Sequence, residues 1–255
     1  MIKVDLVSDI GEGFGRYKLC NEEAIIPLLT SVNIACGFHA GDPNVMRNTV
    51  RICKENNVGI GAHPGFPDLM GFGRRFMKIK DEELENYLYY QIGALEAFAK
   101  LYGEKIQHCL AHGAWGNWLE QDIENARKFV KAVANYSKDI IILAISGGYR
   151  IQVAKELKLR VANEFFADRE VQNNGRLVPR SVSGSVLHEK DKIVERVLKA
   201  VLENKLISFE GKELNVKVDT ICVHGDTAGA LEIIKAIRTA LLKEGVVITK
   251  LSDFV

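Results

Sequence analysis

Histidines recur at similar places in the sequence, each just after a short apolar run. His39 lies in ACGFHAGD, His63 in GAHPGFPD, His112 in LAHGAWGN and His224 in CVHGDT. An imidazole can donate or accept a proton near neutral pH, or bind a metal ion, so histidines that converge would suit acid–base or metal chemistry. A single histidine beside an apolar strand is more often a hydrogen-bonded structural residue. The fourfold recurrence favours a shared site.

Two carboxylates lie close to the first apolar run, IKVDLVSD, which ends at Asp9 and is followed by Glu12. Asp9 with His39 and His63 would offer a carboxylate and two imidazoles to one face of a divalent metal ion. The same groups, with Glu12 and His112, would equally serve as general acid and base. No H-E-x-x-H motif is present to decide between these hypotheses, and both stay open.

Arginines lie in segments that follow apolar runs and are expected to be loops. Arg74 and Arg75 lie in GFGRR, Arg169 in FADRE and Arg180 in LVPRS. A guanidinium binds a carboxylate or a phosphate through two parallel hydrogen bonds. Scattered surface arginines would explain the same residues, whereas arginines gathered at one mouth predict a small anionic substrate.

The composition is that of an ordinary globular chain. Its 255 residues are 47% hydrophobic and 26% charged, and 34 Lys and Arg nearly balance 33 Asp and Glu. This argues against a disordered chain and against nucleic acid or an anionic membrane as a partner. No apolar stretch approaches the roughly 20 residues of a membrane span, and no secretory leader is expected. The five cysteines form no C-x-x-C pair, so we expect reduced thiols in the cytoplasm.

Short apolar runs alternate with amphipathic helices along the chain. The expected strands cover residues 2–9, 32–37, 58–63, 106–112, 139–145, 160–168, 219–225 and 246–251, and the clearest helices cover 81–102 and 189–204. No linker or repeat divides them, which predicts a single α/β domain over residues 1–255. An open doubly wound sheet and a (β/α) barrel of seven or eight parallel strands both fit this order. Six strands end in polar residues that a barrel would bring to one mouth, which favours the barrel.

Two nucleotide-binding fingerprints are absent from the sequence. GEGFG at 11–15 has the spacing G-x-G-x-G, whereas a dinucleotide-binding turn needs G-x-G-x-x-G. No G-x-x-x-x-G-K-[ST] segment is present either, so the chain contains no P-loop.

Several long stretches have a familiar combination of residues: SVNIACGFHAGDPNVM, GIGAHPGFPDLMGFGRRFM, YQIGALEAFAK, FADREVQNNGRLVPRS and DTICVHGDTAGAL. Together they resemble the LamB/YcsF family, the A subunits of prokaryotic ATP-dependent 5-oxoprolinase, over nearly the whole chain. The resemblance implies an irregular (β/α) barrel of the glycoside hydrolase/deacetylase type. It also implies ring-opening of the lactam 5-oxoproline to L-glutamate with ATP hydrolysis, alongside two partner subunits.

The implied reaction gives the matching residues their roles. A lactam is a poor electrophile, and phosphorylation of its amide oxygen by ATP would create a leaving group. A carboxylate or histidine would direct water, while arginines and helix N-termini would hold the substrate carboxylate and phosphate. By the resemblance, catalysis falls to Asp9, Glu12, His39, His63 and His112. Substrate or phosphate binding falls to Asn33, Asp42, Arg74, Arg75, Asn117, Asp168, Arg169, Arg180, His224 and Asp226.

The chain departs from the family pattern in its first and fourth motifs. Val7 stands where the family has Asn, and Leu110, Ala111, Trp115 and Gly116 stand where it has Lys, Pro, Leu and Tyr. These departures keep two alternatives open: a divergent metal-dependent amidohydrolase or deacetylase, and a non-catalytic or engineered homologue. The metal, the oligomeric state, including a homo-oligomer, and the binding of ATP to this chain also stay open.

Overall fold

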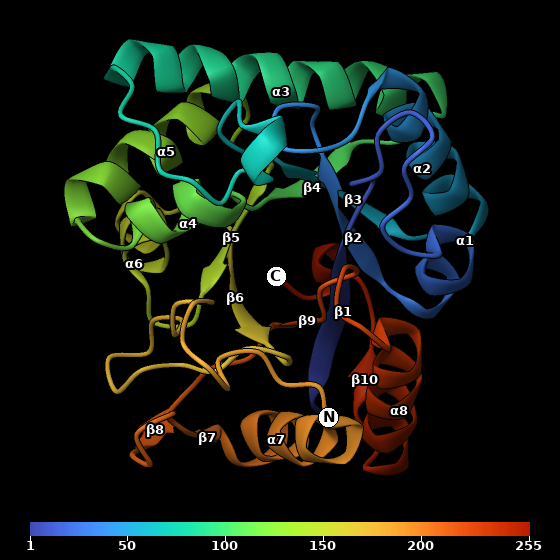
Figure 1. Cartoon of the computed structure of the whole chain (residues 1–255), viewed down its shortest axis with the longest axis vertical. Coiled ribbons are helices and arrows are strands. Elements are labelled where there is room, and N and C mark those ends of the chain that lie inside the picture. Colours follow the sequence, from blue (N-terminus) through green and yellow to red (C-terminus); the bar gives the residue numbers. More distant parts are fainter.

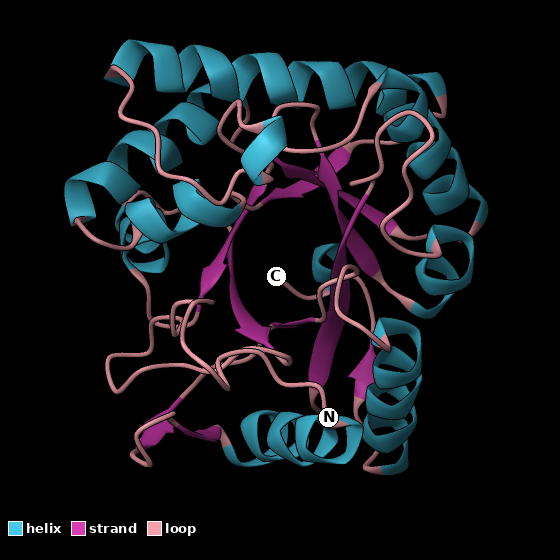
Figure 2. Cartoon of the chain, in the orientation of Figure 1, coloured by secondary structure: helices cyan, strands magenta, loops and turns pink.

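Seven parallel strands close into a barrel at the centre of the molecule. The computed structural model describes residues 1–255. The barrel strands are β1 (Lys3–Ile10), β2 (Ser31–Ala35), β3 (Gly59–His63), β4 (Ile106–Cys109), β5 (Ile141–Ile145), β6 (Val161–Phe166) and β9 (Thr220–Cys222). Each pairs with the next, and β9 returns to β1 to complete the ring (Figures 1 and 2). The predicted barrel is confirmed, and the open sheet is excluded.

The barrel is irregular because two strands share one edge of β1. The eighth parallel strand, β10 (Val247–Ile248), pairs with the start of β1 through Lys3 and Val4. From Asp5 onward the same edge pairs with β9. All eight expected strands are therefore present. The fourth and seventh are shorter than predicted, since the chain leaves the sheet before it reaches His112 and His224.

Helices surround the barrel on its outer face (Figure 2). They are α1 (Glu22–Ile25), α2 (Pro43–Glu55), α3 (Asp81–Leu101), α4 (Gly113–Leu119), α5 (Ile123–Tyr136), α6 (Tyr149–Glu156), α7 (Lys190–Glu203) and α8 (Ala230–Lys243). Short 3-10 turns are η1 (Ile26–Leu28), η2 (Leu69–Gly71) and η3 (Leu251–Asp253), and an antiparallel hairpin joins β7 (Lys205–Ile207) to β8 (Glu213–Asn215). No helix of the chain is both long enough and apolar enough to cross a membrane.

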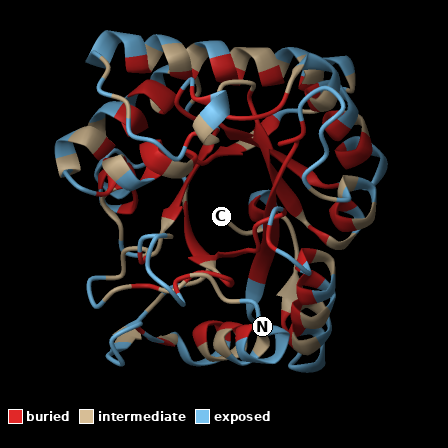
Figure 3. Ribbon diagram, viewed as in Figure 1, coloured by how far each residue is buried: buried red, intermediate tan, exposed pale blue.

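The strands are buried on both faces (Figure 3), as expected where helices cover a parallel sheet. Alternate residues of β5 serve different apolar clusters. Ile142 belongs to the large cluster between sheet and helices, whereas Ile141 and Leu143 join Leu110 and Leu251 in a small one. Because successive strand residues point to opposite faces, the small cluster fills the barrel interior. The polar residues that follow the strands are left at the barrel mouth.

Candidate functional site

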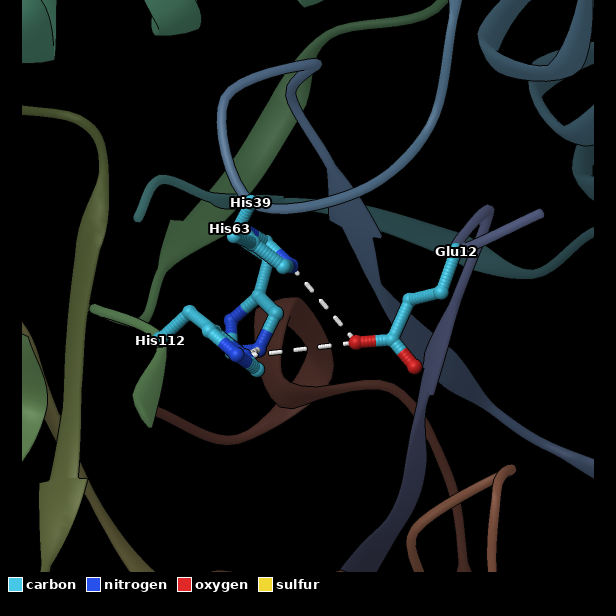
Figure 4. Close-up of side chains that lie close together, drawn as sticks. All are labelled: Glu12, His39, His63 and His112. Atoms are coloured by element: carbon cyan, nitrogen blue, oxygen red, sulfur yellow. Dashed lines mark hydrogen bonds and ion pairs between the residues drawn. The ribbon is translucent and has the colours of Figure 1, made fainter. Parts of the chain in front are cut away.

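Three histidines and a glutamate converge at the carboxyl ends of the first four strands (Figure 4). His63 ends β3, His39 and His112 follow β2 and β4, and Glu12 follows β1. All four residues are buried, and one ligand atom from each lies within 4.8 Å of the others. The barrel thus joins side chains that lie far apart in the sequence, in a group we call the histidine cluster.

His63 and His112 face each other through nitrogens that carry no hydrogen when both rings are neutral. His63 Nδ1 donates to the carbonyl oxygen of Leu110, and His112 Nε2 donates to that of Phe72, each at 2.8 Å. The other two nitrogens, His63 Nε2 and His112 Nδ1, lie 2.9 Å apart, so two lone pairs would meet. A shared proton or a bound cation relieves that repulsion. A backbone carbonyl on the second nitrogen also typically supports metal-binding histidines.

His39 and Glu12 present buried polar atoms that no group of the chain satisfies. Both ring nitrogens of His39 and Oε1 of Glu12 lack a hydrogen-bond partner, and His39 Nε2 lies 3.5 Å from that oxygen. Burial and the charge of Asp9 raise the pKa of Glu12 well above its usual value, while burial and His112 lower the pKa of His39 well below its own. Unsatisfied buried atoms of this kind are satisfied by an ordered water or a bound ion. Three imidazoles and a carboxylate fit a zinc-like divalent ion.

Gly73 allows the rings of His39 and His112 to stack with 3.7 Å between their centroids. A Cβ at residue 73 would lie 2.6 Å from Cβ of His39 and 2.8 Å from Cδ2 of His112. The backbone of Gly73 also has φ of +61°, in the left-handed region that favours glycine. The second glycine of GFGRR, Gly73, therefore allows the close packing of the histidine cluster.

Asp9 lies beside the histidine cluster and carries the negative charge of the site. Its Oδ2 is 3.5 Å from His63 Nε2 and 3.9 Å from His224 Nε2, and its Oδ1 accepts a hydrogen bond from Asn33. Burial alone would raise the pKa of Asp9, but these histidines and the Asn33 amide outweigh it and hold the pKa well below its usual value. Asp9 is thus ionised, and it can orient water or accept a proton.

A chain of hydrogen bonds runs from Asp9 into the barrel interior. Asn33 Nδ2 lies 2.8 Å from Asp9 Oδ1, and Asn33 Oδ1 lies 2.7 Å from His108 Nε2. Because a carboxylate only accepts, Asn33 must donate to Asp9, and His108 must carry its hydrogen on Nε2. His108 Nδ1 then accepts from Gln107 at 3.1 Å, and burial lowers the pKa of His108 to about 3. A Cβ on Gly61 would overlap this ring, so glycine leaves it room.

A cavity of about 600 Å³ opens beside these groups at the barrel mouth. Asp9, His63 and His112 form part of its wall, and the rest of the wall is rich in guanidinium and amide groups. Of the predicted site residues, it contains Asp9, His63, Arg74, His112, Asn117, Arg169, Arg180 and His224. The volume and the convergent polar groups are typical of a small-molecule site.

Other predicted residues lie outside the cavity wall. Asp42 caps α2 and accepts from the backbone of Gly15. Arg75 is held by Asp68, and Asp226 pairs with Arg74 at 2.7 Å. Asp168 accepts from His224 Nδ1 at 2.8 Å, and although burial alone would lower the pKa of His224, Asp168 raises it.

The prediction also omitted several residues that line the cavity or support Asp9. Glu120, Arg150 and Arg176 line the cavity, and His108 supports Asp9 through Asn33. Arg150 lies in SGGYR, directly after the strand predicted at 139–145, which was the signal available for it. His108 lies within a strand, where alternation of side chains was the only signal.

Comparisons with known proteins show the family to which the chain is similar. The sequence matches the LamB/YcsF family over residues 4–255. It is 49% identical to the A subunit of 5-oxoprolinase from Pyrococcus abyssi over 254 residues, covering all of both chains. The crystal structure of a lactam utilization protein from Thermus thermophilus superposes with a TM-score of 0.90 at 39% identity, covering 97% of this chain and 99% of that one.

A more distant structural likeness concerns the fold alone. A family 4 carbohydrate esterase from Streptomyces lividans superposes with a TM-score of 0.50 at 11% identity, covering 96% of this chain and 91% of that one. It agrees with the expected deacetylase-like barrel. From the full-length match and the relatives at up to half identity, the chain belongs to the LamB/YcsF family.

Proposed function

We propose that this chain opens the ring of 5-oxoproline to give L-glutamate, as the A subunit of an ATP-dependent 5-oxoprolinase. Relatives at 49% identity over their full length are named as the A subunit of 5-oxoprolinase. The observation that carries the proposal is the ionised Asp9 beside paired imidazoles on the wall of a cavity rich in arginine. These are the groups that hydrolysis of an anionic cyclic amide needs.

The residues divide the chemical work between them. Asp9 orients water and accepts its proton as the water attacks the ring carbonyl. A proton shared between His63 Nε2 and His112 Nδ1, which lie 2.9 Å apart, passes to the departing ring nitrogen. Guanidinium groups on the cavity wall bind the substrate carboxylate and stabilise charge on the carbonyl oxygen or on a phosphate attached to it.

ATP use and partner subunits follow from the same proposal. An amide resists attack by water, and a phosphoryl group on its oxygen would make the carbonyl carbon reactive. Attack by one water and cleavage of the C–N bond would leave an acyl phosphate, which a second water hydrolyses to glutamate and inorganic phosphate. The chain has no P-loop, so we assign the phosphorylation step to the other subunits and the ring-opening step to this cavity. The five free cysteines fit a reducing compartment such as the cytoplasm.

A second candidate function is metal-dependent hydrolysis of an amide or ester. The observation that favours it is the histidine cluster, whose four ligand atoms lie within 4.8 Å of one another. Glu12, His39, His63 and His112 would hold the ion, which would polarise a carbonyl and lower the pKa of a water molecule. Asp9 would keep its role as the group that accepts a proton.

The two functions are separated by a direct assay. Purified chain is mixed with the other subunits, ATP and 5-oxoproline, and glutamate is measured before and after removal of metal by a chelator. ATP-dependent glutamate supports the first function. The first function fails if no glutamate forms at any subunit ratio. Chelator-sensitive hydrolysis of simple amides or esters without ATP would support the second function.

A further inference from the structure

A buried ion pair lies in the cavity wall, away from the histidine cluster. Arg150, near the start of α6, donates from Nε to Oε1 of Glu120 at 2.7 Å. Arg150 is only 4% exposed and Glu120 only 6%. The other carboxylate oxygen of Glu120 accepts from the backbone of Tyr149 at 2.5 Å. Glu120 therefore fixes both the side chain of Arg150 and the first turn of its helix.

Glu120 accepts a hydrogen bond from only one of the three guanidinium nitrogens of Arg150, Nε. Neither Nη atom of Arg150 has an acceptor within the chain, and Nη1 is fully buried without a partner. Buried donors are satisfied in nearly all folded proteins, and an unsatisfied donor on a charged group is costly. Because Nη1 is enclosed by the chain, Nη2 is the guanidinium nitrogen that remains free to bind a group in the cavity.

The space beside this fork belongs to the cavity. Leu110 and Gly116 line the cavity with Arg150, and neither offers it an acceptor side chain. A Cβ on Gly116 would lie only 2.5 Å from the backbone carbonyl oxygen of Ala111 and 3.9 Å from Arg150 Nη2. Glycine at residue 116 keeps this part of the cavity open.

A second guanidinium with free donors lies on the same wall. Arg180 is half-buried and makes no ion pair or hydrogen bond with any group of the chain, unlike Arg74, which pairs with Asp226. Arg169 donates to the backbone carbonyls of Val178 and Ser185. Five arginines and only two carboxylates line the cavity, so its field favours an anion.

We propose that Arg150, oriented by Glu120 and assisted by Arg180, forms an oxyanion subsite that anchors the charged end of the substrate while its amide lies at the histidine cluster. The subsite deepens the proposed function and rests on it for the identity of the substrate. Its ligand chemistry is a group with several acceptor oxygens, either the carboxylate of 5-oxoproline or a phosphate on the activated amide. Arg150 is thus a specificity-determining residue, and Glu120 is its positioning residue.

The test measures binding to the full chain, without turnover. Calorimetric titrations use 5-oxoproline, inorganic phosphate and 2-pyrrolidinone, the lactam that lacks a carboxylate. The main variant combines Arg150→Gln with Glu120→Gln, because removing one partner alone would bury an unpaired charge. The matched control combines Arg127→Gln with Glu156→Gln, an ion pair outside the cavity.

We expect the main variant to raise the Kd of at least one oxyanion about 10- to 100-fold, as expected for lost hydrogen bonds to a charged group. A loss confined to 5-oxoproline identifies the carboxylate as the ligand, and a loss confined to phosphate identifies the phosphoryl group. The main variant should bind 2-pyrrolidinone with an unchanged Kd. The control variant should bind all three compounds as the wild type does. Arg180→Gln, at a half-buried position, should weaken the same oxyanion and serves as a second test if the double variant does not fold.

Wild-type Kd values for both oxyanions in the folded double variant, or in Arg180→Gln if the double variant does not fold, would overturn the inference. The proposed function fails separately, in the turnover assay. A chain whose oxyanion binding depends on Arg150, but which forms no glutamate with its partners, keeps the subsite and loses the 5-oxoprolinase activity. A chain that forms glutamate, but whose oxyanion binding does not depend on Arg150, keeps the 5-oxoprolinase activity and loses the proposed subsite.

Discussion

His108 offers the sharpest test of how the barrel interior supports the site. Its ring donates to Asn33, which in turn donates to Asp9, so a His108→Leu substitution removes the hydrogen bond that fixes the Asn33 amide. The substitution touches neither the cavity wall nor the histidine cluster directly. Any change in turnover therefore reports on the orientation of Asp9.

The size of the effect follows from the contacts that are lost. Asn33 Oδ1 would be buried without a donor, which costs about 1–3 kcal/mol of unfolding free energy. The amide could then rotate, and Asp9 would lose its fixed donor at 2.8 Å. Loss of such a supporting contact typically lowers activity about 10- to 100-fold. The loss should fall on kcat rather than KM, because the arginines that bind substrate are unchanged.

The assay is ATP-dependent glutamate formation, with stability measured by chemical denaturation. Burial lowers the pKa of His108 to about 3, so the ring is neutral and the loss in kcat should not vary between pH 6 and 9. The matched control is His188→Leu at an exposed position, which should change stability by less than about 0.5 kcal/mol. A folded His108→Leu protein with wild-type kcat, even one that is less stable, would refute the positioning role.

Three further predictions concern stability, packing and metal binding. Burial raises the pKa of Asp5 to about 6, so this group favours folding below about pH 4 and that contribution is lost as pH rises to about 6. Asp5→Asn should therefore flatten the pH dependence of unfolding free energy, by up to about 3 kcal/mol, in denaturation at pH 4 and 7. Gly73→Ala should push His39 from His112 and lower kcat at least about tenfold, since a Cβ would lie 2.6 Å from His39; unchanged kcat would contradict the packing. Glu12→Gln should weaken zinc binding about tenfold or more, measured by elemental analysis after dialysis, and an unchanged zinc content would remove Glu12 from the ligand set.

The strands and the barrel were largely predictable from the sequence. Apolar runs predicted all eight parallel strands, because strands buried on both faces are rich in apolar residues. Polar strand ends then favoured closure into a barrel. The shared edge of β1, which pairs with β10 and β9 in turn, was not predictable, since it depends on long-range pairing rather than local pattern.

The candidate site was predictable only in its outline. His39, His63 and His112 come together as expected from their places after three strands. The sequence favoured Asp9 as a metal ligand, whereas Glu12 completes the group of four and Asp9 lies beside it. Asp9 lies near the end of β1 and Glu12 in the loop that follows, and the path of that loop brings Glu12 to His39.

Other parts of the site depend on contacts that no local pattern encodes. Glu120 directly follows α4 and Arg150 lies in α6, 30 residues away, and each alone is expected at the protein surface. His108 belongs to the barrel interior because Gly61 on the neighbouring strand leaves space for its ring. Such pairings become visible only when the strand register is known.

The decisive experiment compares glutamate formation from 5-oxoproline and ATP, by this chain with its partner subunits, between the wild type and Asp9→Asn. The substitution keeps the shape of the side chain and removes the charge beside His63 and His224. We expect glutamate from the wild type and a loss of about 100-fold or more in kcat for the variant, as for a lost general base. Glutamate formation by Asp9→Asn at the wild-type rate, or none by the wild type at any subunit ratio, would contradict this expectation.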